Sequence, residues 1–202
     1  MNFKQFKNKY CKETPKCSSL SSRIQGWGSE SIALTQAINE TNPQSIVEVG
    51  TWLGASAIHL AKHTQNEIIC VDTYLASNEI LWRQGEVKNL VENFTQVYDQ
   101  FCANITHSNL NLQISPLPMT SSAAAELFLQ ENVKVDMVYI DAGHREREVY
   151  ADLEDWWPLT NSILVGDDYS SKWPGVILAA DRFSLENNLN MQIIDYKFIL
   201  RR

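Results

Sequence analysis

The chain has 202 residues, of which 44% are hydrophobic, and it carries a formal net charge of −7 at pH 7. This length is enough to bury one large core. The acidic balance argues against a protein that binds duplex nucleic acid, because such a protein needs a concentrated basic surface. No apolar run approaches the roughly 18 residues that a membrane-spanning helix requires. We therefore expect neither nucleic acid nor membrane among its partners.

Residues 1–25 predict a cap segment, in which a short helix has aromatic residues on one side and lysines around the rest. Residues 26–202 are expected to form a single domain. The basic start has no apolar stretch behind it of the kind that a secretory signal uses. The four cysteines contain no C-x-x-C pair, so we expect free thiols and a cytoplasmic location. The first helix of the domain is expected from Ser29, its N-cap candidate, to Asn42.

The stretch from Ser45 to Ser56, SIVEVGTWLGAS, predicts a strand, a glycine turn and a helix. Its first residues are rich in β-branched side chains, as in a strand that helices cover on both faces. Glu48 lies inside this run, and because a buried carboxylate is costly unless something binds it, its position suggests a contact with a ligand. Gly50 and Gly54 bracket the turn, which directs backbone N–H groups and a helix N-terminus toward a small polar ligand.

A second buried strand is expected from Glu67 to Val71, and it is followed by Asp72, about twenty residues after the glycine turn. In nucleotide-binding βαβ units an acid at this place meets the ribose hydroxyls. The turn itself does not match the dinucleotide fingerprint, because Trp52 occupies the position of its middle glycine. An ordinary tight turn is the alternative, but the turn and the acid together favour a ligand site.

The rest of the chain continues to alternate strands with helices. Residues 73–85 read as an insertion, which is a candidate lid or substrate wall. We expect strands at 110–114, 133–140 and 162–165, helices at 87–103, 123–130, 145–157 and 176–185, and a hairpin or one long strand at 191–200. This order predicts an α/β fold: a doubly wound, mostly parallel sheet with helices on both faces.

Acidic residues stand at the carboxyl ends of the expected strands, where doubly wound sheets bind ligands: Glu48, Asp72, Asp141, Asp167 and Asp168. Like charges at the last three would raise at least one carboxyl pKa unless a cation neutralises them. Three carboxylates without a nearby cysteine suit Mg²⁺. The alternative is that Asp167 caps a turn and Asp168 is only solvated.

His144 follows Asp141 by three residues at the start of a helix. An imidazole next to a metal-bound hydroxyl is well placed to remove its proton near neutral pH. A histidine that merely bonds the backbone at the start of a helix is the alternative interpretation.

Six segments together resemble the successive motifs of class I S-adenosylmethionine-dependent methyltransferases: VEVGTWLGAS, VDTYL, ISPLPMTSSAAAEL, VYIDAGHREREVYADLEDWWP, ILVGDDY and WPGVILAADRF. They are most similar to the metal-dependent O-methyltransferases of macrolide sugars, and more distantly to catechol O-methyltransferases. The resemblance extends from about Gly26 to the C-terminus. It implies a Rossmann-like sheet of seven strands and an S-adenosylmethionine cofactor.

The resemblance also implies roles for individual residues. The methionine end of the cofactor is expected at Glu48, Gly50, Thr51, Gly54 and Ser56, the ribose at Asp72 and Thr73, and the adenine around Met119, Thr120 and Ser121. The metal, Mg²⁺ or a similar cation, is expected at Asp141, Asp167 and Asp168. Asp141 would also contact the cofactor, and Asp141 and His144 are the catalytic candidates.

The expected acceptor is a small molecule with adjacent oxygens. Catechol enzymes usually carry a lysine in place of His144 and an amide in place of Asp168, so these two residues favour a sugar or polyol over a catechol. Candidates for the acceptor pocket are Trp52, Tyr74, Trp82, Tyr169 and Trp173. The chain is also a candidate homo-oligomer.

Other classes of protein remain alternatives. A nicotinamide-dependent oxidoreductase would share the fold, although the missing glycine argues against it. An iron and 2-oxoglutarate hydroxylase would need a second histidine downstream of His144 to complete its metal site, and this chain has none there. A binding module without catalysis would not need the acids at the strand ends.

Overall fold

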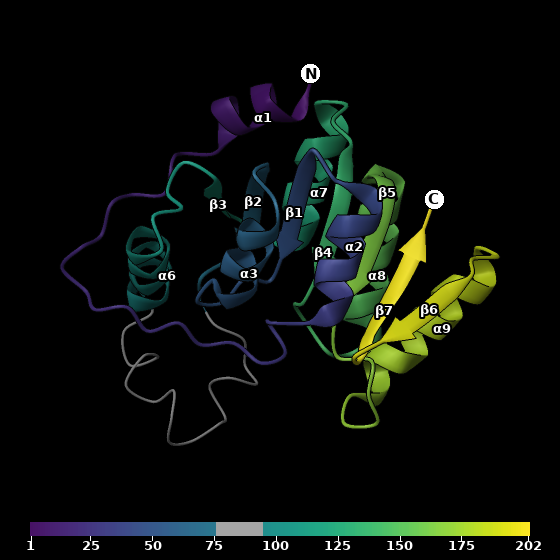
Figure 1. Ribbon diagram of the computed structural model, residues 1–202. Helices are drawn as coiled ribbons and strands as arrows, with labels where there is room; N and C mark the ends of the chain where they lie inside the picture. The colour runs from purple at the N-terminus through teal and green to yellow at the C-terminus, as the bar shows by residue number, and fades with distance from the viewer. Residues whose placement is uncertain (76–94) are drawn as a thin grey trace.

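The computed structural model describes residues 1–75 and 95–202 (Figure 1). Its strands are β1 (Ser45–Val49), β2 (Glu67–Asp72), β3 (Ile114–Pro118), β4 (Val135–Ile140), β5 (Thr160–Gly166), β6 (Met191–Ile194) and β7 (Lys197–Arg201). They form one sheet in the order β3-β2-β1-β4-β5-β7-β6. The strands β1 to β5 pair in parallel, and the hairpin of β6 and β7 adds to β5 in antiparallel orientation. The predicted mostly parallel, seven-stranded sheet is confirmed.

Helices cover both faces of this sheet (Figure 1). They are α1 (Phe3–Tyr10), α2 (Ile32–Thr41), α3 (Ala55–His63), α6 (Thr95–His107), α7 (Ser121–Gln130), α8 (Glu146–Trp156) and α9 (Pro174–Glu186), with a short 3₁₀ turn at Trp157–Leu159. Within the described chain, α1, α7, α8 and α9 pack on one face, and α2, α3 and α6 on the other. Side chains of one strand alternate between the two cores, because successive residues point to opposite faces. Val47 and Val49 join the first core, while Ile46 joins the second.

The N-terminal helix α1 is held to the domain by buried contacts. Phe6 is fully buried, and its ring lies 4.0 Å from that of Phe128. The Lys7 ammonium bonds the Glu67 carboxylate at 2.8 Å and the Leu112 carbonyl at 3.0 Å. The lysine-rich helix is therefore more than a solvated cap, and the division of the chain at residue 25 stays a prediction.

Two expected boundaries were wrong. The third strand runs from Ile114 to Pro118 instead of 110–114. Prolines lack the N–H that a central strand needs, but β3 lies at the sheet edge and pairs only with β2, so proline is tolerated there. The N-cap of α2 is Ser31, whose hydroxyl accepts a hydrogen bond from the Ala33 N–H at 3.1 Å, and not Ser29.

Other expectations were confirmed in part. The helix expected at 87–103 is described from Thr95 onward as α6. The lid expected at 73–85 lies outside the described residues after 75. All four cysteines are free thiols. None of the helices in the described part is long and apolar enough to cross a membrane.

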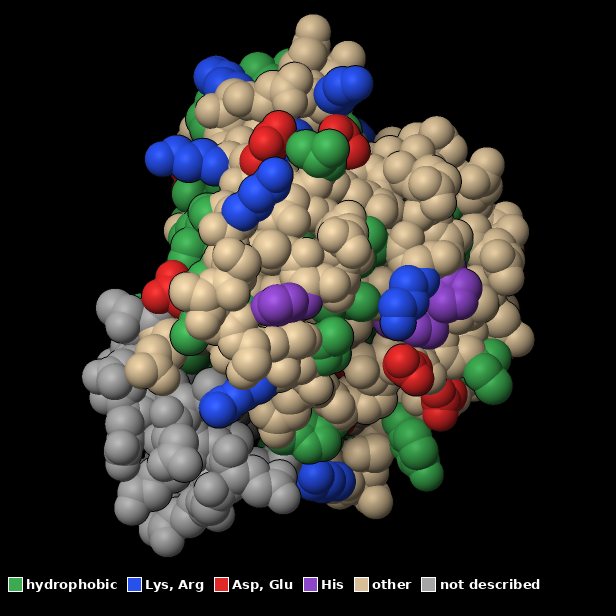
Figure 2. All heavy atoms as spheres, turned by 60° about the vertical axis from the view of Figure 1, so that its left-hand side comes forward, with side chains coloured by type: hydrophobic (Ala, Val, Ile, Leu, Met, Phe, Trp, Pro, Cys, Tyr) green, Lys and Arg blue, Asp and Glu red, His purple; other side chains and the backbone are tan. Residues whose placement is uncertain are grey.

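The face formed by α3 and α6 carries charges of both signs. Figure 2 shows Lys and Arg side chains interspersed with Asp and Glu over this side of the described chain. A mixed surface of this kind differs from the single basic patch that a nucleic-acid duplex requires. The expectation that the protein does not bind nucleic acid stays a prediction.

The order of the strands creates a crevice between β1 and β4. The chain leaves β1 in one direction along the sheet, through β2 and β3, and then returns to β4 on the other side. The loops after β1 and β4 therefore diverge, which is where open α/β sheets bind ligands. The Asp141 N–H donates to the Val49 carbonyl at 2.8 Å, so the ends of the two strands stay together below the crevice.

Candidate functional site

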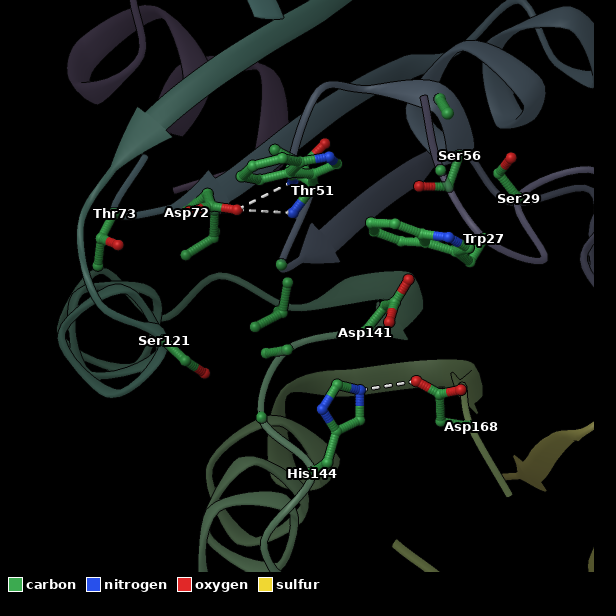
Figure 3. Close-up of a pocket in the computed structure, with 18 of the residues that line it drawn as sticks. Trp27, Ser29, Thr51, Ser56, Asp72, Thr73, Ser121, Asp141, His144 and Asp168 are labelled. Atoms are coloured by element: carbon green, nitrogen blue, oxygen red, sulfur yellow. Dashed lines mark hydrogen bonds and ion pairs between the residues drawn. The ribbon is translucent and has the colours of Figure 1, made fainter. Parts of the chain in front are cut away.

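A cavity of about 360 Å³ opens at the carboxyl ends of β1, β2 and β4 (Figure 3). Its walls come from the glycine turn, from the ends of β2 and β4, from the starts of α7 and α9, and from the N-terminal segment before α2. This size falls within the range of small-molecule sites. Most of the expected cofactor residues line it: Gly50, Thr51, Ser56, Asp72, Thr73, Ser121 and Asp141. Asp168 lines it as well, and so does His144.

Gly50 allows the strand ends to meet beneath the cavity. Its φ of +82° lies in the left-handed region, and a Cβ at this position would lie 2.1 Å from the Asp141 carbonyl oxygen. Gly54, at φ +84°, begins α3, and a Cβ there would touch the Phe101 ring. Only glycine avoids both restrictions, so these two residues let the turn pack closely against the end of β4 and against α6. Gly54 itself does not line the cavity.

Glu48 lies behind the cavity wall and not in it. Its carboxylate is fully buried and accepts hydrogen bonds from the Thr51 hydroxyl at 3.0 Å and from the Ser56 hydroxyl. The Cys70 thiol is 3.6 Å away. Burial raises the pKa of Glu48 to about 7, and the hydroxyl donors oppose this rise. The residue expected to contact the cofactor thus holds two others, Thr51 and Ser56, that line the cavity.

Asp72 closes the glycine turn and faces the cavity (Figure 3). One carboxylate oxygen accepts the backbone N–H groups of Thr51 and Trp52, each at 3.0 Å, and the other accepts the Tyr74 N–H at 2.7 Å. Burial raises its pKa, and these N–H donors lower it in part. The Thr73 N–H also stabilises the carboxylate, so backbone donors surround Asp72 at the cavity wall.

At the start of α7 the structure separates two neighbouring hydroxyls. The Thr120 hydroxyl caps the helix by accepting the Ala123 N–H at 3.3 Å, and Thr120 does not line the cavity. Ser121 does line it, and its hydroxyl bonds the Asp152 carboxylate at 2.5 Å and the Trp156 indole N–H at 2.9 Å. Burial raises the pKa of Asp152 to about 6.

Asp141, His144 and Asp168 form a group whose ligand atoms all lie within 4.8 Å of one another. The imidazole Nε2 of His144 lies 2.7 Å from the Asp168 carboxylate, as Figure 3 shows. The plane of the imidazole is fixed by stacking on Trp173, with the rings 3.9 Å apart and inclined by 12°. Burial raises the pKa of Asp141 well above its usual value, and the charges of Asp167 and Asp168 raise it further.

The structure does not bring Asp167 into this group or into the cavity. Its two carboxylate oxygens are each 2.7 Å from the Lys197 ammonium. They also accept the Tyr139 hydroxyl at 2.6 Å and the Asp168 N–H at 2.7 Å. Lys197 comes from β7, a partner that the sequence pattern did not indicate.

Residues before α2 line the cavity although the sequence pattern assigned them no role in the site. These are Gln25, Gly26, Trp27 and Ser29. Figure 3 places the Trp27 indole over the cavity, between Ser56 and Asp141. A Cβ on Gly26 would lie 2.7 Å from the Ala55 Cβ, so glycine lets this segment approach the start of α3. The sequence Gly26-Trp27-Gly28, an aromatic residue between two glycines, was the available signal.

Only some of the candidates for the acceptor pocket line the cavity. Trp52 and Trp173 line the cavity, and the indole N–H of Trp52 is buried without a hydrogen-bond partner in the described structure. Tyr74 is buried in the core beside α6. The Tyr169 hydroxyl instead bonds Asp181 at 2.7 Å. Trp82 lies outside the described residues.

Comparison with known proteins identifies the family. A model described as a methyltransferase domain matches residues 47–169, which include the glycine turn and the acids of the site. Because this match covers more than half of the chain, the protein belongs to that methyltransferase family. No curated protein matches the chain in sequence.

Three solved structures with a similar fold are O-methyltransferases. NovP shares 15% identity at a TM-score of 0.57, covering 84% of this chain and 76% of its own. CalS11, a TDP-rhamnose 3'-O-methyltransferase of calicheamicin biosynthesis, shares 16% identity at a TM-score of 0.54, and the match covers 84% of this chain and 76% of CalS11. An O-methyltransferase from Bacillus cereus, solved with S-adenosylhomocysteine (SAH), shares 17% identity at 0.56, covering 90% and 83%. The chain therefore has the class I methyltransferase fold.

Proposed function

We propose that this methyltransferase transfers a methyl group from S-adenosylmethionine to a hydroxyl of a small molecule with adjacent oxygens, with the help of a divalent cation. The observation that carries the proposal is the composition of the cavity. Its wall includes the glycine turn with Asp72 and also Asp141, His144 and Asp168. A donor site and a deprotonation site thus share one space.

The residues present fit S-adenosylmethionine. The turn after β1 brings Thr51 and Trp52 to the cavity wall beside Asp72, and a carboxylate after the second strand is where nucleotide-binding βαβ units hold a ribose hydroxyl. Met119 and Ser121 would flank the adenine, while Thr51, Ser56 and Trp27 would surround the methionine end. When bound, this cofactor supplies a methyl group on a sulfonium, which is a good leaving group. The chain contributes position.

The donor set also fits a hard divalent cation. Asp141 and Asp168 would hold it, since two carboxylates with water and substrate oxygens are the usual protein contribution to a magnesium site. When bound, such a cation lowers the pKa of an acceptor hydroxyl that it contacts. Besides burial, the like charges of the neighbouring acids raise the pKa of Asp141, and a cation would neutralise them.

His144 is the proposed general base. Its bond to Asp168 and its stacking on Trp173 fix both the tautomer and the plane of the ring. Because imidazoles titrate near neutral pH, such a group can accept a proton from a hydroxyl at the working pH. Asp168 would stabilise the imidazolium that forms.

We propose a sugar or polyol as the acceptor. His144 and Asp168 differ from the catechol pattern, and the Trp27 indole at the cavity (Figure 3) offers a flat apolar surface for a sugar ring. CalS11, one relative in fold, acts on TDP-rhamnose according to its name. A catechol-like acceptor is the alternative. The cytoplasmic location and a homo-oligomeric state stay predictions.

Two measurements test the proposal. Titration with SAH and with NAD should show binding of SAH alone, and tighter binding of NAD would overturn the choice of cofactor. Methyl transfer from labelled S-adenosylmethionine to vicinal diols and sugars should fall at least about tenfold in EDTA and in an Asp141→Asn variant. Activity that is unchanged in EDTA would remove the cation from the mechanism.

A further inference from the structure

The Asp167 carboxylate has no acceptor position left for a metal ion. One oxygen accepts bonds from Lys197 and from the Asp168 N–H, each at 2.7 Å. The other accepts bonds from Lys197 at 2.7 Å and from the Tyr139 hydroxyl at 2.6 Å. A carboxylate offers about four acceptor positions, and all of them are used here. A metal could reach Asp167 only by displacing one of these donors.

All three N–H donors of the Lys197 ammonium are also used. Its side chain is 1% exposed, and its ammonium, which has three N–H donors, bonds both oxygens of Asp167 and the Gly28 carbonyl at 3.1 Å. The pair is buried, because the side chain of Asp167 is only 8% exposed. A buried carboxylate and ammonium hold each other in place, since separating them would leave an unpaired charge.

The neighbouring carboxylates are much less occupied. The Tyr139 hydroxyl lies a long 3.3 Å from the Asp141 carboxylate, and its single proton is directed to Asp167 at 2.6 Å. Asp168 has the His144 imidazole on one oxygen. Asp168 also has a φ of +61°, which is uncommon for a residue other than glycine. Its N–H is fixed on Asp167, and its side chain is turned toward His144 (Figure 3).

The charges at this edge of the sheet also favour a cation held by two carboxylates. Asp141, Asp167 and Asp168 bring three negative charges if all are ionised, and Lys197 neutralises the one to which it is paired. Two negative charges remain, on Asp141 and Asp168, and both residues line the cavity. One divalent cation balances them.

We propose that Lys197 acts as a built-in cation that withdraws Asp167 from metal binding, so that a divalent ion is held by Asp141 and Asp168 alone. This inference rests on the proposed function, which supplies the reason for a cation. Asp167 and Lys197 are then positioning residues. They fix the backbone of Asp168, and through Gly28 they fix the segment that carries Trp27. A site with two protein carboxylates leaves more coordination positions for the acceptor oxygens.

Binding of Mn²⁺ to the full chain saturated with SAH tests this inference. Electron paramagnetic resonance measures how much ion is bound, and water proton relaxation measures how many waters coordinate it directly. The double variant Asp167→Leu/Lys197→Met removes the pair without leaving an unpaired charge, and leucine offers no oxygen to an ion. We expect it to keep the Mn²⁺-bound waters of the wild type and its affinity within about tenfold, the lower end of the cost of changing a supporting residue. Asp168→Ala, which leaves no oxygen ligand at this position, should bind at least about tenfold more weakly and gain inner-sphere water.

A second variant keeps the test decisive if the double variant loses SAH binding. Lys197→Met frees Asp167, so Mn²⁺ should bind more tightly and with fewer inner-sphere waters than in the wild type. Unchanged waters in Lys197→Met, or a gain of water in the double variant that equals that of Asp168→Ala, would overturn the inference while the proposed function stands. A wild-type protein that binds SAH but no Mn²⁺ would overturn the inference and the cation of the proposed function together, and would leave methyl transfer itself intact.

Discussion

Replacing Glu48 by glutamine should change how the stability of the protein depends on pH. Glu48 is fully buried behind the glycine turn, and burial raises its pKa from 4.5 to about 7. Between these values the folded state binds the proton more readily than the unfolded state does. The free energy of unfolding therefore falls as the pH rises from about 4.5 to about 7, and the loss is complete above that window.

The size of this effect follows from the shift of the pKa. Each pKa unit corresponds to about 1.4 kcal/mol, so the shift from 4.5 to about 7 predicts a loss of about 3 kcal/mol across the window, to order of magnitude. A glutamine side chain does not titrate, so the variant lacks this contribution. Asp152, another buried acid, titrates in both proteins and cancels in the comparison.

Urea unfolding of both proteins at about pH 4.5 and about pH 8 measures this difference. We expect the wild type to lose about 3 kcal/mol more than Glu48→Gln between these conditions. Glu40→Gln is the control, because Arg201 lowers the pKa of this exposed carboxyl and the sign of its contribution is opposite. Equal pH dependence of the wild type and Glu48→Gln would refute the reasoning.

Three further substitutions test the fold and the site. Gly50→Ala should lower the free energy of unfolding in urea by at least about 2 kcal/mol, because it adds left-handed strain to a contact of 2.1 Å with the Asp141 carbonyl. The control Gly143→Ala, whose new methyl group meets the side chain of Glu148, should cost less than about 1 kcal/mol. Similar costs for the two variants would contradict this prediction. Thr120→Ala should lower the free energy of unfolding by about 1 kcal/mol, because the helix cap is lost. Its affinity for SAH, measured by calorimetry, should stay unchanged because Thr120 does not line the cavity, and weaker SAH binding would show that Thr120 contacts the cofactor. Phe128→Ala should lower stability by about 3 to 5 kcal/mol, because the ring is fully buried, and a cost below about 1 kcal/mol would show that the core refills.

Much of the fold could be predicted from local patterns. The β-branched run before Gly50, the two glycines and the apolar helix after them predicted β1, the turn and α3, which the structure confirms. The same pattern predicted β2 with Asp72 at its end. These elements depend on near neighbours in the chain, because strand pairing and helix periodicity leave a regular spacing of residues. The strand β3 was misplaced because its prolines are tolerated only at a sheet edge, and edge position is a property of the whole sheet.

The candidate site was predicted less completely. Residue types at strand ends identified the acids of the cavity wall, Asp72, Asp141 and Asp168, and the resemblance to a known family added several of its other residues. Glu48 was predicted as a ligand contact, yet it supports Thr51 and Ser56 from behind. A buried acid looks the same in sequence whether a ligand or a hydroxyl satisfies it, since both remove the cost of its burial.

The sequence by itself determined the alternation of strands and helices, the glycine turn and the set of acids at the strand ends. Only the tertiary structure decided which of these acids face the cavity and which are paired. Asp167 and Asp168 are adjacent in the chain, yet one is bonded to Lys197 from β7 and the other to His144. Trp27 likewise reaches the cavity from a segment before the first strand. Such partners are far apart along the chain, and their meeting depends on the order of strands in the sheet, which no local spacing of residues encodes.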